Sequence, residues 1–354
     1  MENIISFPHM ANYYVPSKYL FSHILDVEVI ESPPITTKTI ELGSKYSPDF
    51  VCTPFKYTLG NFIETLNNGA NILIQFGGGC RYGYYYELQN KVLEDLGYNF
   101  KLINLVTAGK IDIKKIIKEL KDIDPKFSKI RGLYYLLITK KMTEYMDIID
   151  DYIRKNIGFE VEKNSFINLK DKMLHDFSNI KGYRHLKKIY KKYHKLFKSI
   201  KICKPKDHLK VGIIGELYTV MEPFANYNIE YELAKKGVEI TRFTNVTYLL
   251  FKKKKKVKKY LKELNNIKYR MGADATDNIY FARWMCEHNF DGIIHIKSSF
   301  CTPEISSMGI INKICSSYNV PVNFFSFDSN TSEVGIKTRI EAFYDMIEMR
   351  KKHE

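Results

Sequence analysis

The chain has 354 residues, enough for two domains that each bury a core, and its hydrophobic fraction of 45% excludes a disordered protein. No apolar run approaches the ~18 residues that a membrane span needs. The N-terminal segment lacks the basic region and apolar core of a signal peptide. We therefore expect a cytoplasmic protein without a membrane partner. The net charge of +15 is compatible with nucleic acid, an acidic protein or a phosphate-bearing substrate as partner.

Strand-like and helix-like runs alternate in the first 125 or so residues, with glycine at the end of each helix-like run. This alternation is typical of a parallel, doubly wound sheet. The predicted strands are 26–31, 48–52, 70–76 and 100–106, and the predicted helices are 61–69 and 84–97.

From residue 111 to about 200, long helical periods replace the alternation. We expect a basic helical linker or insert over 126–207. Two lysine-rich runs, 182–210 and 251–270, carry much of the positive charge. Apolar residues recur at helical spacing between the lysines of the first run, which indicates an amphipathic helix with a solvated basic face. No nucleic-acid motif accompanies the charge, so we do not expect nucleic acid as a partner.

A second alternating region begins at residue 208 and runs to a C-terminal helix. Its predicted strands are 209–216, 238–243, 290–299 and 320–327, and its predicted helices are 229–237, 277–289, 304–319 and 338–354. The sequence thus predicts an α/β protein with two doubly wound, Rossmann- or flavodoxin-like parallel-sheet domains, 1–125 and 208–354, joined by the helical segment 126–207.

The stretch QFGGGCRYGYYYELQ, residues 75–89, places glycines between a predicted strand and a predicted helix. Dinucleotide folds use this position, but the spacing is not GxGxxG and the next predicted strand has Asn104 in place of a ribose-binding acid. No GxxxxGK[ST] motif occurs either. Nucleotide binding is therefore the less favoured interpretation, although it stays open.

Three of the six cysteines stand between a predicted strand and a predicted helix, namely Cys52, Cys80 and Cys301. Parallel sheets bind their ligands at the carboxyl ends of their strands. A helix N-terminus also favours the thiolate form that binds metal. The other three cysteines, Cys203, Cys286 and Cys315, are expected to be small buried or incidental thiols.

Three thiolates from two domains suit a metal centre with one open position. Zinc accepts three thiolates, but the paired cysteine spacing of a tight zinc site is missing here. Thiolate sites without that pairing also suit iron–sulfur clusters. The cysteine spacing by itself leaves both metals open.

Several stretches resemble the 2-hydroxyacyl-CoA dehydratase family and, more closely, its acyl-CoA dehydratase activase-related branch. They are CTPFKYTLGNF from Cys52, GGGCRYGYYYELQ around Cys80, KVGIIGELYTVMEPFANYNIEYEL from Lys210, FCTPEISSMGIINKI around Cys301, and the tail FDSNTSEVGIKTRIEAF. The likeness spans most of the chain and is least specific in the basic helical middle.

The resemblance implies a [4Fe-4S] cluster held by Cys52, Cys80 and Cys301 at the interdomain cleft, or a larger double-cubane cluster as in related proteins. Gly78 and Gly79 would let the backbone approach the cluster, because glycine adopts dihedral angles that other residues avoid. Arg81 would balance the cluster's negative charge or reach a phosphate of an acyl-CoA substrate.

The family's companion is an ATP-dependent activase, itself an iron–sulfur protein, which reduces the cluster at low potential. The resemblance therefore implies either an iron–sulfur dehydratase or an ATP-dependent reductase component, working as a homodimer or with a related subunit. A non-catalytic electron-transfer or scaffold role in the same system is an alternative. A nucleotide- or nucleic-acid-binding protein is the alternative from another class.

Overall fold

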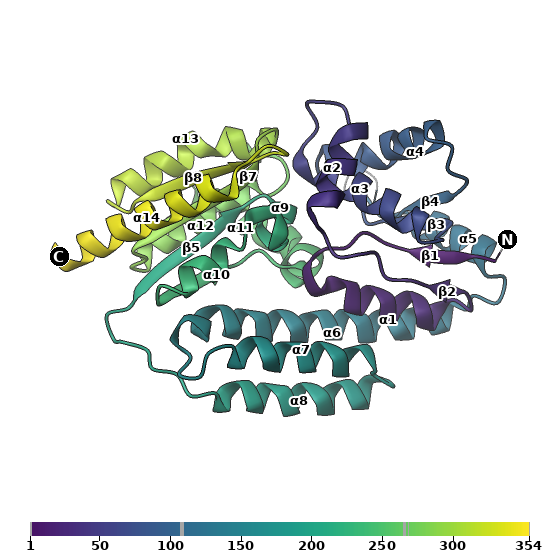
Figure 1. Cartoon of the computed structure of the whole chain (residues 1–354), viewed down its shortest axis with the longest axis horizontal. Coiled ribbons are helices and arrows are strands. Elements are labelled where there is room, and N and C mark those ends of the chain that lie inside the picture. The colour runs from purple at the N-terminus through teal and green to yellow at the C-terminus, as the bar shows by residue number, and fades with distance from the viewer. Residues whose placement is uncertain (1, 107–109, 265–266, 268, 354) are drawn as a thin grey trace. The chain divides into compact units, whose positions relative to one another are not determined.

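The computed structural model describes residues 2–106, 110–264, 267 and 269–353. It divides into two compact units, Met1–Thr143 and Glu144–Glu354, and Figure 1 shows the elements of each. Each unit contains one parallel sheet of four strands with helices around it. This confirms the predicted α/β class with two doubly wound domains. The division falls inside a long helix, α6 (Lys129–Asn156), within the segment that the sequence predicts to be helical.

The first unit has the strand order β2-β1-β3-β4, with every pair parallel. Its strands are β1 (Ile4–Ser6), β2 (Glu28–Val29), β3 (Ile72–Gln75) and β4 (Lys101–Asn104), and its helices are α1 (Tyr14–Ile24), α2 (Thr37–Tyr46), α3 (Thr53–Asn67), α4 (Tyr85–Asp95) and α5 (Ile113–Ile123).

Alternation along β3 explains why both faces of this sheet are covered. Leu73 packs into a cluster with Phe62 of α3, whereas Ile72 and Ile74 pack into a second cluster with Phe21 of α1. All of these side chains are buried. The sheet is therefore a middle layer between two sets of helices, as parallel sheets require.

The predicted strand 48–52 is wrong, because these residues form a turn between α2 and α3. Phe50 is 77% exposed, whereas Val51 and the partly buried Cys52 pack against the core, and the backbone here turns instead of extending as a strand. The sequence analysis also missed α2, which crosses α3 closely. A Cβ on Gly43 would lie 1.8 Å from the Lys56 carbonyl oxygen, so glycine permits this crossing.

The short strand β1 was missed too, although it lies between β2 and β3 in the sheet. Its three residues are too few to display a period, and a central strand of a parallel sheet is buried on both faces. The side chains of Ile5 and Ser6 are accordingly fully buried.

The second unit has the strand order β6-β5-β7-β8, again with every pair parallel. Its strands are β5 (Leu209–Gly215), β6 (Val238–Arg242), β7 (Gly292–Ser298) and β8 (Val322–Phe327), and its helices after α6 are α7 (Ser165–Ser178), α8 (Tyr183–Ser199), α9 (Leu217–Met221), α10 (Ile229–Ala234), α11 (Lys253–Glu263), α12 (Ala275–Glu287), α13 (Thr302–Ser317) and α14 (Glu333–His353).

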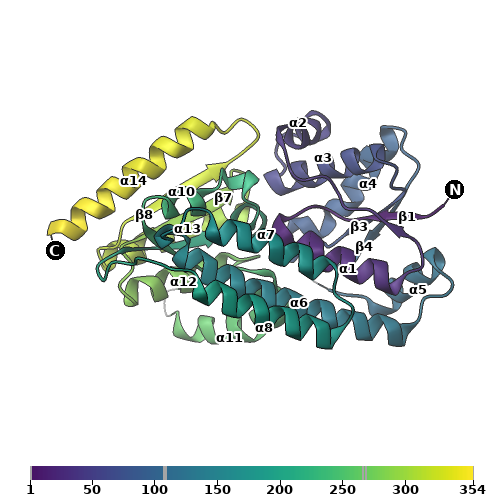
Figure 2. The ribbon, with the colours of Figure 1, turned by 60° about the horizontal axis from the view of Figure 1, so that its bottom comes forward.

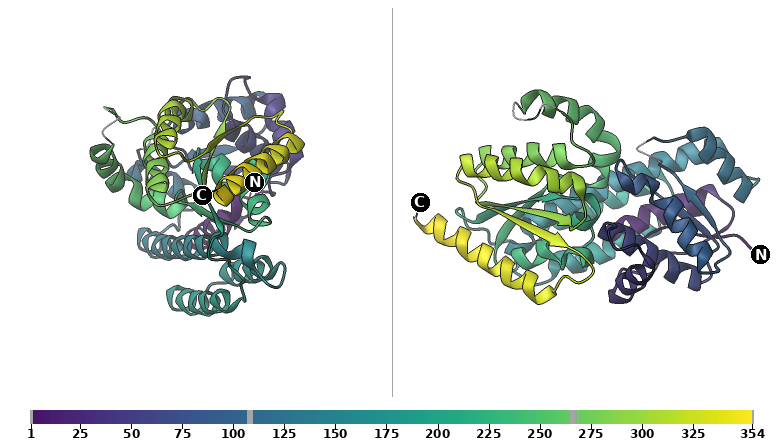
Figure 3. Two further views of the ribbon diagram at one scale, coloured as in Figure 1. Left: turned by 90° about the vertical axis from the view of Figure 1, so that its left-hand side faces the viewer. Right: turned by 90° about the horizontal axis from the view of Figure 1, so that it is seen from above.

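The central strand β7 separates two apolar clusters in this unit. Ile293 packs with Ile279 of α12 and Ile311 of α13, whereas Ile294 packs with Phe343 of α14. Figure 3 shows α13 and α14 on opposite faces of the sheet. The second unit is therefore another three-layer α/β arrangement.

The two lysine-rich runs form helices with solvated basic faces. Figures 1 and 2 show α7 and α8 side by side, and α8 buries Tyr193 and Phe197 while its lysines face solvent. In the second run, α11 buries Val257 and Tyr260. Residues 265, 266 and 268 of that run lie outside the described part of the chain. No described helix combines the length and apolarity that crossing a lipid bilayer requires.

Both sheets therefore share one strand order, in which the third strand lies next to the first on the side away from the second. In such sheets the chain changes direction between the first and third strands, and a crevice opens beyond their carboxyl ends. These ends are the candidate binding edge of each unit.

Candidate metal centre

Cys52 lies at the N-terminus of α3 and not at a strand end as predicted. It is the N-cap of the helix, Pro54 occupies the first turn, and the Cys52 carbonyl accepts from the Phe55 backbone N–H at 2.9 Å. Proline is favoured there because the first helical N–H groups have no partner within the helix. The thiol therefore sits where the positive end of the helix dipole favours its thiolate form.

Cys80 follows β3 and caps the short 3-10 turn Arg81–Tyr84, which leads into α4. Its Sγ accepts a hydrogen bond from the Tyr82 backbone N–H at 3.4 Å, and its carbonyl accepts from the Gly83 N–H at 3.0 Å. A sulfur that accepts from a backbone N–H is stabilised as the thiolate. Cys80 thus lies at the strand end that the sequence predicts.

Two tyrosines connect these cysteines to the carboxyl end of β3. Cys52 Sγ donates to Tyr85 Oη at 3.3 Å, and burial raises the pKa of this tyrosine, with Cys52 adding to the shift. Tyr82 Oη lies 3.0 Å from Thr58 Oγ1 of α3 and donates to Gln75 Oε1, at the end of β3, at 3.4 Å. The start of α3 and the Cys80 turn therefore meet at the carboxyl edge of the first sheet.

The glycines before Cys80 differ in what they do. Gly77 has φ +70°, and a Cβ there would lie 1.9 Å from the Val106 carbonyl oxygen, so its role is to shape the turn. A Cβ on Gly78 would contact the Tyr82 ring at 3.2 Å, whereas a Cβ on Gly79 would meet nothing within 4 Å. Only Gly79 therefore borders open space beside the cysteine, and Arg81 on the next turn is exposed.

Cys301 is the N-cap of α13 in the second unit and follows β7, as predicted. Its backbone N–H donates to the Ser298 carbonyl at 3.0 Å, and its own carbonyl accepts from the Ile305 N–H at 3.0 Å. The residue is only 9% exposed. Lys297, the next-to-last residue of β7, is buried, and burial lowers its pKa while Cys301 opposes the shift.

The two helix-capping cysteines share a local sequence. Cys52 and Cys301 each precede Thr-Pro, and a glycine follows eight positions later, at Gly60 and Gly309. Both helices therefore begin with the same Cys-Thr-Pro arrangement, with cysteine as N-cap and proline in the first turn. Cys80 and Cys301 are also equivalent by topology, because each follows the third strand of its sheet.

The remaining cysteines lie elsewhere. Cys203 is exposed in the segment between α8 and β5. Cys286 and Cys315 are buried between α12 and α13, with their sulfurs 4.0 Å apart. Their position in an apolar cluster matches the predicted role of core thiols.

Glu216 directly follows β5 at the carboxyl edge of the second sheet and caps α9. Its carboxylate accepts from the Tyr218 N–H at 2.8 Å and from Thr219 N–H and Oγ1 at 3.0 and 2.6 Å. Burial nevertheless raises the pKa of Glu216 to about 7, against these hydrogen bonds, and the nearby Asp274 adds to the shift. The side chain is thus an N-cap with an unusual proton affinity.

Sequence reasoning missed a buried polar network behind Cys301. It consists of Asn278, His295 and Glu304, whose side chains are all 0% exposed. A signal was available, because a histidine inside an apolar strand needs a hydrogen-bonding partner, and the following helix carries an acid in its first turn. Lys297 was also missed, although a lysine inside the same apolar strand gives a similar signal.

The structure places two of the predicted ligands, Cys52 and Cys80, at one edge of the first unit, and the third, Cys301, at the corresponding edge of the second. Among the described residues, no three His, Cys, Asp or Glu side chains form a group that could hold a metal ion. The joining of all three cysteines around one cluster therefore stays a prediction.

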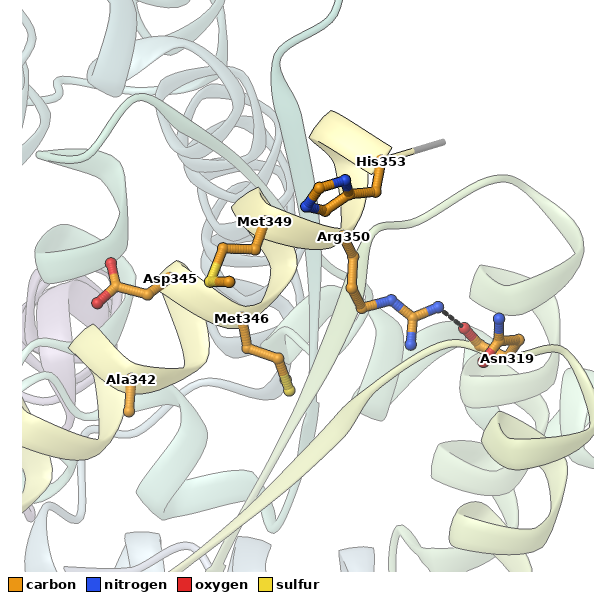
Figure 4. A pocket seen from close by; sticks show the side chains of 7 residues that line it. All are labelled: Asn319, Ala342, Asp345, Met346, Met349, Arg350 and His353. Carbon is orange, nitrogen blue, oxygen red and sulfur yellow. Dashed lines mark hydrogen bonds between the residues drawn. The ribbon is translucent and has the colours of Figure 1, made fainter.

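An open hollow of about 660 Å³ lies at the opposite end of the second unit from Cys301 (Figure 4). It is lined by Met346, Met349 and His353 of α14, and Arg350 donates across it to the Asn319 carbonyl. The neighbouring Lys351 donates to the carbonyl of His208, just before β5. The hollow therefore lies at the amino ends of the strands and is not part of the candidate centre.

Residues 255–347 match the family model of the 2-hydroxyglutaryl-CoA dehydratase D-component. This part of the chain resembles a dehydratase subunit. The match includes Cys301 together with α12, β7 and α13, and it supports the likeness to the 2-hydroxyacyl-CoA dehydratase family. Cys52 and Cys80 lie outside the matched residues. A comparison with curated proteins finds no match.

Proposed function

We propose that the chain is a dehydratase-like subunit that holds an iron–sulfur cluster through Cys52, Cys80 and Cys301. The observation that carries the proposal is that each of these cysteines caps a helix or a 3-10 turn at the carboxyl edge of a parallel sheet. Helix N-termini stabilise thiolates, and thiolates are the ligands of iron–sulfur clusters.

The surroundings of the cysteines fit such a group. Gly79 borders open space next to Cys80, so the backbone can approach a bulky inorganic ligand there. The exposed Arg81 and the buried Lys297 supply positive charge close to Cys80 and Cys301, respectively. A cluster bound by three thiolates is anionic, and these cations would offset part of its charge.

When bound, the cluster would supply one-electron chemistry at low potential. The chain's own residues would hold the thiolates in orientation and keep solvent from the Cys301 side, because that cysteine is nearly buried. We infer further that an ATP-dependent activase delivers the electron and that an acyl-CoA is the substrate class. The family match, whose description names a CoA thioester dehydratase, supports this class.

An electron-transfer or scaffold role in the same system remains the second candidate. Cys301 is only 9% exposed, and a well-shielded ligand favours electron transfer over direct substrate binding. The two roles differ in whether an added acyl-CoA perturbs the spectrum of the reduced cluster.

The test is to measure iron and acid-labile sulfide per chain, with EPR, on protein purified without oxygen. Wild type is compared with Cys52→Ala, Cys80→Ala and Cys301→Ala, and Cys203→Ala and Cys286→Ala serve as an exposed and a buried control. We expect about four irons per chain, or about eight for a double cubane, in the wild type and both controls. We expect Cys52→Ala, Cys80→Ala and Cys301→Ala to lose the iron and the sulfide. Wild type without iron after reconstitution would refute the proposal.

A further inference from the structure

The polar side chains behind Cys301 form a buried network inside the second unit, in which Glu304 Oε1 and His295 Nδ1 have no hydrogen-bond partner among the described residues. Asn278 comes from α12, His295 from β7 and Glu304 from the first turn of α13, and none is accessible to solvent. Burying a carboxylate is costly unless hydrogen bonds or an opposite charge compensate for the lost water. The position of Glu304, three residues after Cys301, therefore calls for an explanation.

Glu304 is the centre of this network. Its Oε2 accepts from Asn278 Nδ2 at 2.9 Å and lies 2.8 Å from His295 Nε2. With the ring proton on Nε2, His295 donates to this same oxygen. The helix α12 and the strand β7 thus both contact the first turn of α13 through Glu304 Oε2.

Asn278 extends the network to β5. Its Oδ1 accepts from the Gly215 N–H at 3.2 Å, and its Nδ2 also donates to the Gly215 carbonyl at 3.0 Å. Gly215 has φ +144°, and a Cβ there would lie 1.8 Å from the Ile296 carbonyl oxygen, so glycine is required. The turn that carries Glu216 and the helix that begins at Cys301 are therefore held by the same amide.

A charge of opposite sign lies nearby. Lys297 is 5% exposed, and burial lowers its pKa, while Cys301 and Glu304 oppose the shift. Its ammonium is therefore within electrostatic reach of both the thiol and the carboxylate. A group held by Cys301 would therefore have one acidic and one basic side chain of its own unit nearby.

We propose that Glu304 is a positioning residue that fixes the Cys301 turn through Asn278 and His295 and, together with Lys297, sets the electrostatic environment of the ligand. The inference deepens the proposed cluster function and rests on it for the electrostatic part. Removing a negative charge beside a cluster favours its reduced state, and removing a positive charge disfavours it.

The first experiment measures the midpoint potential of the cluster in Glu304→Gln and Lys297→Met. We expect Glu304→Gln to raise the potential and Lys297→Met to lower it. Shifts of the midpoint potential in opposite directions indicate an effect of charge. A purely structural effect of the two substitutions would not depend on the sign of the charge removed. Glu348→Gln and Lys352→Met are matched controls, since this exposed pair lies 2.9 Å apart near the C-terminal end of α14. Shifts of the same sign, or none, would overturn the electrostatic part.

The second experiment needs no cluster. Hydrogen–deuterium exchange is measured over 215–219 and 301–305 in wild type, Glu304→Ala and Glu304→Gln. Loss of a buried hydrogen-bond acceptor should speed exchange in both segments by roughly tenfold in Glu304→Ala, and Glu304→Gln should restore most of the protection. Unchanged exchange in Glu304→Ala would refute the positioning role. Wild type without a cluster would remove the electrostatic part together with the proposed function, and the exchange result would still decide whether Glu304 fixes the turn.

Discussion

The two units have the same strand order but present their cysteines in different ways. In the first unit, Cys52 and Cys80 are half-buried beside two tyrosines, and the turn between β3 and α4 borders open space at Gly79. In the second unit, Cys301 is nearly buried, and Glu304 in the first turn of the helix that Cys301 caps accepts a hydrogen bond from Asn278. The same strand order therefore carries one cysteine turn that borders open space and one cysteine turn backed by a buried polar network.

The largest effects should come from two glycines, Gly77 in the turn between β3 and α4 and Gly215 in the turn between β5 and α9. Gly215→Ala and Gly77→Ala each place a Cβ within 2 Å of a carbonyl oxygen at positive φ. Each should lower the free energy of unfolding by about 3 kcal/mol or more, measured by urea denaturation. Gly79→Ala, which meets no atom, is the control and should change stability by less than about 0.5 kcal/mol. Equal losses of unfolding free energy in Gly77→Ala and Gly79→Ala would contradict the open space beside Gly79.

The buried network of the second unit should rank next. Asn278→Ala leaves both backbone groups of Gly215 and an oxygen of Glu304 short of a partner, and should cost about 2–4 kcal/mol in unfolding free energy. Asn312→Ala, on the exposed face of α13, should cost about 0.5 kcal/mol or less.

The first unit offers a direct counterpart to that substitution. Its buried amide pair joins Gln75 Nε2 to Gln89 Oε1 at 2.7 Å. Gln89→Ala breaks this one hydrogen bond, whereas Asn278→Ala breaks three, so the cost of Gln89→Ala in unfolding free energy should be smaller. A larger loss of unfolding free energy in Gln89→Ala than in Asn278→Ala would contradict the stronger hydrogen bonding inferred for the second unit.

The pH dependence of stability should show the proton affinity of Glu216. Burial raises its pKa from an ordinary 4.5 to about 7, so the folded chain binds this proton more tightly than the unfolded chain. The stabilisation is fully present below pH 4.5 and is lost as the pH rises through about 7. Wild type should therefore lose about 1–2 kcal/mol relative to Glu216→Gln over this window, allowing for solvent screening. Parallel pH profiles of the two proteins would contradict the shift.

The smallest effect should come from the tyrosine that contacts Cys52. Tyr85→Phe removes the acceptor of the Cys52 thiol, a weak sulfur donor, and should cost about 0.5–1 kcal/mol in unfolding free energy. Tyr84→Phe, one residue earlier and 55% exposed, should be neutral. An unchanged free energy of unfolding in Tyr85→Phe would show that this hydrogen bond does not stabilise the first unit.

Much of the fold could be predicted from the sequence because long strands and glycine-terminated helices carry clear periods. The prediction failed where burial depends on context. The strand β1 is too short to display a period, and the turn at Phe50 and Val51 resembles a strand although one side chain is exposed and the other buried. The close crossing of α2 and α3 depends on Gly43 facing a carbonyl, which no local pattern reveals.

The candidate site divides in the same way. The sequence places Cys80 and Cys301 correctly after strands, because a strand followed by a helix is a local signal. It selects Cys52 from a strand that does not form, and the family resemblance selects the same residue independently. The network of Asn278 and Glu304 joins residues 26 positions apart, and only the packing of three elements brings them together.

The most direct test of the central claim is native mass spectrometry of the anaerobically purified chain. The claim is that ligands from both units hold one cluster. We predict a single discrete mass increment of iron and sulfide per chain, present in wild type and Cys286→Ala and absent from both Cys80→Ala and Cys301→Ala. An intact increment in either of the last two variants would contradict a cluster shared by the two units.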